Sequence, residues 1–276
     1  MVNYAPFAAL FLLAGCAVPA SVQTVDFENP AYDIGEAYDR AAQELEWDVI
    51  NSPTRMDIDH AVISDDFAAS GSRSLKITYP AGEQSVKQAA WGLPGRSNYK
   101  LEYKVRFADD FDFNGRAGAK SGRNGGKLPG LAALPEDGTL MCTGGKSCDA
   151  GRGFSARLMW RTDGVGVLYL YDLTKSRTGQ KWGEDIEFSG ASKFTPGRWL
   201  HIRQDIILNT PGQANGSVRV FLDGELVVNL QNREIIGGAE KIDVVLFSTF
   251  FGGNSEEWFP AKDQTAYFDD FTVTAK

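Results

Sequence analysis

The chain has 276 residues, of which 43% are hydrophobic, 12% aromatic and 23% charged. This is the composition of an ordinary globular protein that is long enough to bury a full core. The formal net charge of −8 argues against a general nucleic-acid binder, because an acidic surface repels phosphate. A binding site for any polyanion must therefore be a local basic region.

The N-terminus has the features of an export signal. Its apolar run, Ala8 to Leu13, is too short to span a bilayer as a mature helix. The segment Leu13-Ala14-Gly15-Cys16 resembles the bacterial lipobox, which implies a signal peptide over residues 1–15 and lipidation of Cys16. Because Ala17 rather than an acidic residue follows the cysteine, the resemblance favours an exported lipoprotein of the outer membrane, periplasmic or at the cell surface. The alternative is an ordinary secretory signal that ends near Ala17 or Ala20.

After a short tether over residues 16–25, no Pro/Ser-rich linker, internal repeat or low-complexity run marks a second domain. We therefore expect a single domain over residues 26–276, acting as a monomer. Gly35 to Trp47 is weakly helical and either forms a helix or covers a sheet edge. Leu75 to Tyr79 and Tyr99 to Phe107 alternate apolar and polar residues, which predicts two half-buried strands.

The segment from Phe113 to Gly153 is glycine-rich and cationic with little alternation, and we expect a functional loop there. Between Arg116 and Arg161, eight cations against three acids give a local charge of +5. The cations are Arg116, Lys120, Arg123, Lys127, Lys146, Arg152, Arg157 and Arg161, and the acids are Glu136, Asp137 and Asp149. This segment is where the sequence predicts an anion-binding region.

Cys142 and Cys148 remain as an even pair once Cys16 is set aside, and in an oxidising compartment they predict a small disulfide loop. A zinc site is the alternative. It is disfavoured because the chain has only two histidines, His60 and His201, and neither is near the cysteines in sequence.

A hairpin follows, with strands over Phe154 to Arg161 and Val167 to Tyr171 around an Asp163-Gly164 turn. Alternation places Ser155, Arg157, Tyr169 and Tyr171 together on the polar face of this hairpin. If the turn centres on Asp163, Arg157 lies opposite Tyr169 and Ser155 lies opposite Tyr171, with directly opposed Cβ atoms about 4.5–5.5 Å apart. Taken alone, the pattern also fits an ordinary exposed sheet face.

Further alternating segments continue to the C-terminus: Trp199 to Leu208, Val218 to Leu222, Leu226 to Leu230 after an Asp223-Gly224 turn, Val244 to Phe251, and Ala266 to Thr274. Many strands, hairpin turns and little helix predict an all-β fold. The length suits a β-jelly-roll (concanavalin-like) sandwich of two antiparallel sheets.

Three segments resemble polysaccharide lyase family 14: Gly125 to Leu131, Phe154 to Trp160, and Ser248 to Gly253. The resemblance runs from about Gly71 to the C-terminus. It implies a β-jelly roll that cleaves a 4-linked polyuronate, alginate or glucuronan, by β-elimination. It places the family's functional set on Lys127, Ser155, Arg157, Tyr169 and Tyr171.

Elimination removes the C5 proton next to a charged carboxylate, so cations must neutralise that carboxylate. Arg157, assisted by the Ser155 hydroxyl, suits this role because a planar guanidinium matches carboxylate geometry. Lys127 is the expected base or enolate stabiliser, and Tyr169 or Tyr171 the acid that protonates the leaving O4. We expect Lys127 and one tyrosine to lower each other's pKa.

The basic residues Arg123 and Arg161 are the further substrate-binding candidates, and the only partner expected besides the lipid anchor is the acidic polysaccharide. The scheme requires no metal and no cofactor, and we predict none.

Two other functions fit less well. A concanavalin-like glycoside hydrolase needs two carboxylates on one strand face, and within Glu184 to Glu187 only Asp185 and Glu187 share a face. A non-catalytic polyuronate-binding protein would use exposed aromatic residues, for which the candidates are Trp91, Trp182 and Trp258.

The two histidines have other interpretations. We expect His201 to belong to a scaffold strand. His60 follows Asp57 and Asp59, which could hold a structural Ca²⁺ together with Asp269 or Asp270, although solvated turn acids explain these residues more simply.

Overall fold

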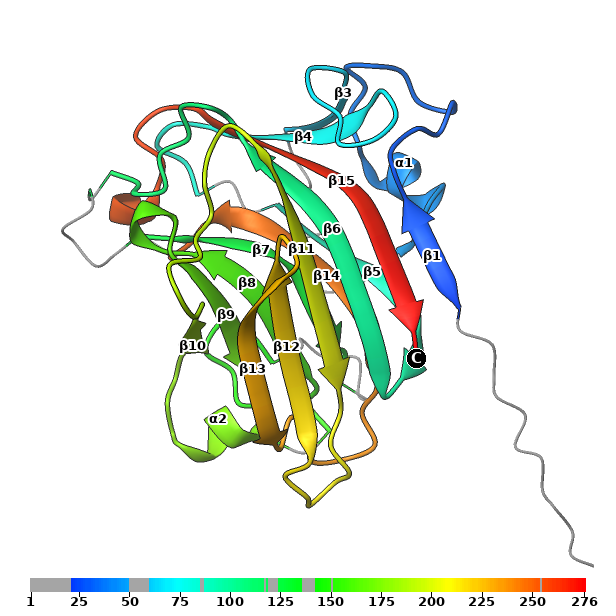
Figure 1. The fold of residues 1–276 in the computed structure, drawn as a ribbon, viewed down its shortest axis with the longest axis vertical. Coiled ribbons are helices and arrows are strands. Elements are labelled where there is room, and N and C mark those ends of the chain that lie inside the picture. The colour runs from blue at the N-terminus through cyan, green and yellow to red at the C-terminus, as the bar shows by residue number, and fades with distance from the viewer. Residues whose placement is uncertain are drawn as a thin grey trace, which may run out of the picture.

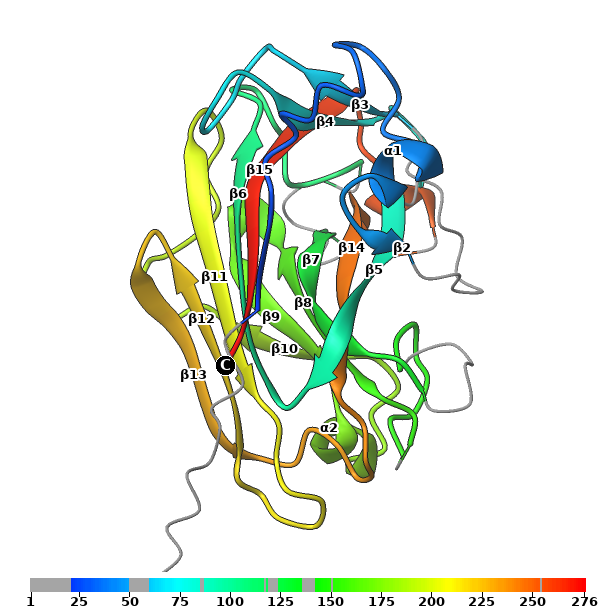
Figure 2. The same cartoon turned by 90° about the vertical axis from the view of Figure 1, so that its right-hand side faces the viewer.

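The computed structural model describes residues 21–49, 60–84, 87–116, 118, 124–135, 142–149, 151–253 and 255–276. Two antiparallel sheets stack as two layers (Figures 1 and 2). The strands of sheet A lie in the order β13 (Glu225–Arg233), β12 (Gly216–Leu222), β11 (Trp199–Ile207), β6 (Asn98–Phe107), β15 (Gln264–Ala275), β4 (Ser74–Tyr79) and β3 (Ala61–Ser64), with β1 (Val22–Val25) also paired to β15. The strands of sheet B lie in the order β10 (Glu184–Glu187), β9 (Gly166–Tyr171), β8 (Phe154–Trp160), β7 (Gly126–Ala133), β14 (Ile242–Phe251), β5 (Lys87–Arg96) and β2 (Asp48–Val49).

Helices are few and short in the described part of the chain. They are α1 (Arg40–Glu44), α2 (Leu173–Arg177) and the 3₁₀ turns Thr162–Gly164 and Glu256–Trp258. The two α-helices lie at opposite ends of the sandwich (Figure 2). None of the helices described is long and apolar enough to cross a membrane.

The predicted all-β sandwich of two antiparallel sheets is confirmed. Each strand predicted from alternation is present with ends within two residues of those expected, except that β13 continues to Arg233, beyond the expected end at Leu230. The weakly helical stretch contains α1. The predicted tether is wrong in its last residues, because Val22–Val25 form β1 and pair with β15 from Val22 opposite Thr274 to Val25 opposite Phe271. The predicted loop between Phe113 and Gly153 is also wrong in part, because it contains β7.

The core lies between the two sheets and is filled by one face of every long strand. Aromatic side chains from the two layers meet there. Trp160 of β8 packs edge-on against Phe107 of β6 with ring centroids 5.7 Å apart, and Phe247 of β14 packs against Phe268 of β15 at 5.3 Å. One face of sheet B is buried in this core, so a site on this sheet must lie on its opposite, outer face.

A bulge in β7 sets which of its side chains face outward. Leu128 and Leu131 both point into the core although they are three residues apart, because the register with β8 shifts between Leu128 and Gly130. The bulge frees backbone groups, and sheet A satisfies them: the Tyr103 hydroxyl donates to the Pro129 carbonyl (3.1 Å), and the Gln204 amide oxygen accepts from Leu131 N–H (2.9 Å). Lys127 is thereby directed outward, away from sheet A.

Candidate active site

Three adjacent strands of sheet B carry the five residues that the sequence analysis grouped: Lys127 on β7, Ser155 and Arg157 on β8, and Tyr169 and Tyr171 on β9. Arg157 lies opposite Tyr169 and Ser155 opposite Tyr171, which confirms the predicted register. The turn has the left-handed backbone that Asp-Gly favours, with φ of 56° at Asp163 and 80° at Gly164.

Lys127 lies beside the hairpin, opposite Met159 of β8 on one side and Phe250 of β14 on the other. The local sequence permits this approach because Gly126 has no side chain: a Cβ there would lie 1.9 Å from the Trp160 ring. The structure therefore brings all five residues together on the outer face of sheet B.

This polar face is not the ordinary exposed sheet face that the pattern taken alone would also fit. The exposed fractions are 9% for Lys127, 3% for Arg157, 8% for Tyr169 and zero for Ser155 and Tyr171. The loop closed by Cys142 and Cys148 packs on the outer face and forms a small apolar cluster with Met159, Val167, Tyr169 and Tyr171. The site is thus a second buried layer that lies outside the sandwich core.

Burial changes the chemistry of Lys127. Desolvation, then the nearby Arg157 and Arg161 guanidiniums, lower the pKa of the Lys127 amine well below its ordinary value, against a smaller opposing effect of Asp185. The amine donates to the Met159 sulfur (2.8 Å) and lies 4.3 Å from the centre of the Tyr169 ring. Neither neighbour carries a negative charge that would pair with an ammonium group.

Arg157 is buried, and its hydrogen-bond partners in the described part of the chain are neutral. Its Nη1 donates to the Ser248 hydroxyl (3.3 Å) and its Nη2 to the Thr143 hydroxyl (2.5 Å), while Nε has no partner among the described residues. Among the residues that the structure describes, neither Arg157 nor Lys127 forms an ion pair. A buried guanidinium without a counter-ion is costly to the fold, and an anionic ligand would compensate its charge.

The two tyrosines form a pair. Their hydroxyl oxygens are 3.3 Å apart and their rings meet edge to face at 5.4 Å. Backbone N–H groups donate to both hydroxyls: Gly183 to Tyr169 (3.2 Å) and Gly145 to Tyr171 (3.0 Å). Gly183 lies so close that a Cβ there would be 2.7–2.8 Å from both rings.

The expected mutual lowering of pKa between Lys127 and a tyrosine is wrong for Tyr169. Burial, then the hydrogen bond with Tyr171, raise the pKa of Tyr169 above its ordinary value, and the Arg157 charge opposes this only in part. The lysine amine therefore loses its proton more readily than usual and the Tyr169 phenol keeps its proton more firmly.

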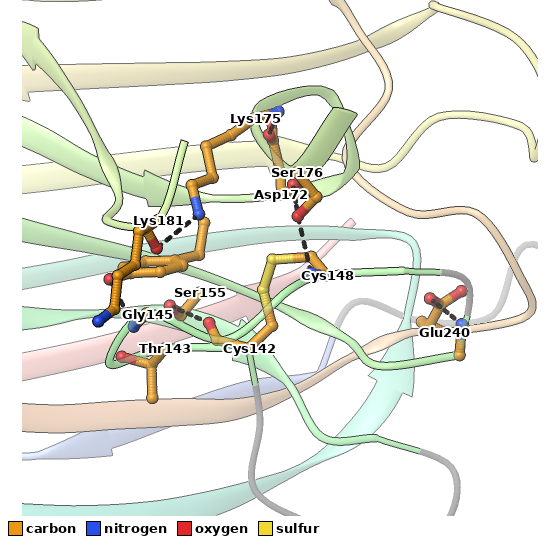
Figure 3. The surroundings of a disulfide bond; sticks show 12 residues. Cys142, Thr143, Gly145, Cys148, Ser155, Asp172, Lys175, Ser176, Lys181 and Glu240 are labelled. Atoms are coloured by element: carbon orange, nitrogen blue, oxygen red, sulfur yellow. Dashed lines mark hydrogen bonds between the residues drawn. A yellow bond between two sulfur atoms is a disulfide. The ribbon is translucent and has the colours of Figure 1, made fainter. Parts of the chain in front are cut away.

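Cys142 and Cys148 are joined by a disulfide, with their Cα atoms 5.1 Å apart (Figure 3). The Cys142 carbonyl accepts a hydrogen bond from Ser155 (2.9 Å), and Cys148 N–H donates to the Ser176 hydroxyl of α2 (2.7 Å). Because the single proton of Ser155 is already donated to the loop, Ser155 cannot at the same time donate it to a substrate.

The two additional basic candidates have different outcomes. Arg161 lies at the site, 5.6 Å from the Tyr169 ring, but its guanidinium is paired with Asp185 through bonds of 2.8 and 2.7 Å. Arg123 lies outside the described residues, as does Cys16.

Most of the remaining candidates belong to the scaffold. Trp91 was expected to be exposed, but it is fully buried and stacks on Trp47 with ring centroids 4.3 Å apart. His201 is on sheet A with Nε2 3.7 Å from a Glu102 carboxylate oxygen. Asp269 is not a solvated acid, because it is fully buried and accepts the Ala69 N–H (2.7 Å). Trp182 is 53% exposed.

Among the described residues, no group of three or more His, Cys, Asp or Glu is placed to hold a metal ion. Asp57 and Asp59, which the Ca²⁺ hypothesis required, lie outside the described residues.

Among the contacts of the site that were not foreseen are those of Met159 and Phe250 with Lys127 and that of Thr143 with Arg157. The alternation of β8 and β14 could have identified the first two, since it places them on the outer face. Nothing in the sequence marks Thr143, because its segment has no periodicity.

Residues 67–271 match the family model for polysaccharide lyase 14. The chain belongs to this family. It is therefore a polysaccharide lyase, and its motifs lie on the strands described above. The 66 residues that precede the match include β1, α1, β2 and β3.

Solved and curated relatives agree with this assignment. The marine polysaccharide lyase 14 alginate lyase from Aplysia kurodai is 26% identical, with a TM-score of 0.64 over 78% of this chain and 87% of its own. The alginate lyase Aly36B bound to an alginate tetrasaccharide shares the fold, with 21% identity and a TM-score of 0.72 over 93% and 97% of the two chains. Exolysin from Paramecium bursaria Chlorella virus 1 is 27% identical over 203 residues. The match covers 64% of the present chain but only 30% of the length of exolysin.

Proposed function

We propose that this lyase cleaves a 4-linked polyuronate, alginate or glucuronan, by β-elimination and leaves unsaturated uronide ends. The observation that carries the proposal is the pair of buried basic groups, Lys127 and Arg157, neither of which has an ion-pair partner within the described residues. A uronate carboxylate supplies the missing negative charge. The alginate tetrasaccharide bound by the structural relative Aly36B is a polymer of this chemical class.

Lys127 is the base in this proposal. Its lowered pKa provides a neutral amine near neutral pH, which can take the C5 proton of the sugar. As that C–H bond breaks, its electron pair forms an enolate on the carboxylate. The Arg157 guanidinium stabilises this charge, with two N–H groups that the protein occupies only with hydroxyls and a third, Nε, that it leaves unpaired.

The tyrosine pair supplies the acid. Because burial holds the proton on Tyr169, the hydrogen-bonded pair of Tyr169 and Tyr171 can deliver a proton to O4 as the C4–O4 bond breaks and the C4–C5 double bond forms. The proton gained by Lys127 balances the one lost by the phenol. Loss of that proton from Lys127 and return of one to the phenolate, by exchange with solvent after the product leaves, resets the site.

The test is to incubate the purified protein with polymannuronate, polyguluronate and glucuronan while following the absorbance of the unsaturated product. We expect product from at least one of them. Cleavage without a new double bond would indicate hydrolysis, and calorimetric binding without turnover on every polymer would indicate a binding protein. Either result would overturn the proposal.

We also propose that Cys16 is lipidated and anchors the lyase to the outer membrane, on the basis of Leu13-Ala14-Gly15-Cys16. The expected outcome for Cys16→Ser is that the protein leaves the membrane fraction while the specific activity of the soluble form is unchanged. Membrane fractionation and incorporation of a labelled fatty acid measure this. Retention of Cys16→Ser in the membrane fraction would contradict the anchor.

A further inference from the structure

The disulfide loop from Cys142 to Cys148 makes three separate hydrogen bonds to the candidate active site. The Cys142 carbonyl accepts from Ser155, the Thr143 hydroxyl accepts from Arg157, and Gly145 N–H donates to Tyr171. The loop therefore contacts three of the five grouped residues through their functional atoms. Its far end is fixed to α2 through Cys148 and Ser176, and the disulfide joins the two ends (Figure 3).

Thr143 makes the shorter of the two hydrogen bonds that orient Arg157. The other partner, Ser248 of β14, is 3.3 Å from Nη1, whereas the Thr143 hydroxyl is 2.5 Å from Nη2. With Nε unpaired, these two hydroxyls fix the plane of the guanidinium. Since an arginine recognises a carboxylate through a planar fork, the orientation of that plane decides how well it can stabilise an enolate.

We propose that Thr143 is a positioning residue of the lyase: its hydroxyl, held in place by the Cys142–Cys148 disulfide, orients the Arg157 guanidinium toward the substrate carboxylate. The inference rests on the proposed function, because it assigns Thr143 to the same elimination. The residue does not touch the reacting atoms and acts only through Arg157.

Alternative roles for the loop fit the contacts less well. A loop that served only to cover the apolar cluster would not need its threonine hydroxyl directed at a buried cation. A hydroxyl also suits the task chemically, because a carboxylate at this place would pair with Arg157 and compete with the substrate. The loop thus orients the charge without cancelling it.

The test compares Thr143→Val, which removes the acceptor at nearly constant shape, with Thr143→Ser, which keeps it. Ser147→Val is the matched control, because Ser147 is an exposed residue of the same loop. We expect kcat/KM on the best polyuronate to fall roughly 10- to 100-fold in Thr143→Val, as for the loss of a hydrogen bond to a charged group. Thr143→Ser and Ser147→Val are expected to stay within about threefold of the native protein, since one keeps the acceptor and the other lies away from the site.

The pH profile distinguishes positioning from a general loss of structure. The charged and titratable groups that act on the Lys127 amine are Arg157 on β8, Arg161 after β8 and Asp185 on β10, and the Tyr169 ring of β9 lies beneath it. If the Arg157 charge moves away, the pKa of Lys127 rises, and the acidic limb of kcat/KM moves to higher pH. We expect this displacement in Thr143→Val only. Partial unfolding would lower the activity without moving the limb.

Three results would overturn the inference: activity of Thr143→Val within twofold of native, equal losses in Thr143→Val and Thr143→Ser, or equal losses in Thr143→Val and Ser147→Val. If the native protein forms no unsaturated product, the proposed function fails, and positioning is then decided without activity. Nitrogen-15 NMR of Arg157 should show restricted rotation of its Nη groups in the native protein and in Thr143→Ser but not in Thr143→Val. Identical rotation in the native protein and in both variants would reject the positioning role of Thr143.

Discussion

The central cations on the outer faces of the two sheets differ in whether an acid pairs with them. On sheet A, Lys104 pairs with Asp270 (2.8 Å), and Arg203 and Arg219 share Asp205 (2.6 and 3.1 Å). On sheet B, Lys127 and Arg157 form no ion pair among the described residues. The alternation of the strands is the same on both sheets, so the distribution of acids is what separates a scaffold face from a reactive one.

Exposure makes the contrast sharper. The cations of sheet A are partly exposed, with 34% for Lys104 and 33% for Arg203, so that water as well as their acidic partners stabilises their charges. Lys127 and Arg157 are nearly inaccessible, and burial of their charges opposes folding. Burial of these basic groups therefore lowers the free energy of unfolding at the positions on sheet B where an anionic substrate would bind. The paired cations of sheet A carry no such cost.

The largest effect is expected for Lys127→Ala. Loss of the base should lower kcat roughly 100- to 10,000-fold. Lys104→Ala is the control on sheet A and should leave kcat unchanged, because its amine serves only a surface pair with Asp270. Formation of unsaturated product measures both variants, and circular dichroism checks their folds. Full activity of Lys127→Ala would remove this residue from the mechanism.

Arg157→Met should separate activity from stability. The variant loses the group that we propose stabilises the enolate, so kcat should fall roughly 100- to 1,000-fold. Removal of an uncompensated buried charge should leave the free energy of unfolding unchanged or raise it by about 1–4 kcal/mol. Urea unfolding measures this second effect.

The counterpart on sheet A is Asp205→Leu. It leaves Arg203 and Arg219 without their acid and should lower the free energy of unfolding by roughly 1–3 kcal/mol with little change in kcat. If Arg157→Met and Asp205→Leu destabilised the protein equally, the contrast between the two faces would be wrong.

The smallest effect concerns pH. If Lys127 is the base, as proposed, activity needs its neutral amine, so kcat/KM should fall as the pH drops through the lowered pKa of this residue. Asp185 favours the ammonium form; Asp185→Asn therefore lowers the pKa of Lys127 further and should move the acidic limb to lower pH by less than one unit. Asp263→Asn is the control, because Asp263 is exposed and accepts a hydrogen bond from Ala81 N–H away from the site. It should leave the acidic limb of kcat/KM in place. Displacement toward higher pH in Asp185→Asn would contradict the assignment of the base.

The sequence predicted the hairpin register but not its surroundings. Register follows from local information, the Asp163-Gly164 turn and strict alternation, so Arg157 and Tyr169 could be paired in advance. The strand β7 was missed because Pro129 and its bulge break the alternation between Leu128 and Leu131. Burial of the site was missed because the covering loop is aperiodic, and only tertiary contact brings Gly145 to Tyr171.

Gln204 links the reactive strands to the opposite layer. Its side chain spans the core from β11, accepting from Leu131 N–H of β7 and donating to the Ala156 carbonyl of β8 (2.7 Å), next to Arg157. Transplanting only the strands of sheet B into another jelly roll would leave both backbone groups without partners in an apolar interior. Any graft of the candidate active site must therefore include Gln204 of β11. The smallest transferable unit contains residues from both layers.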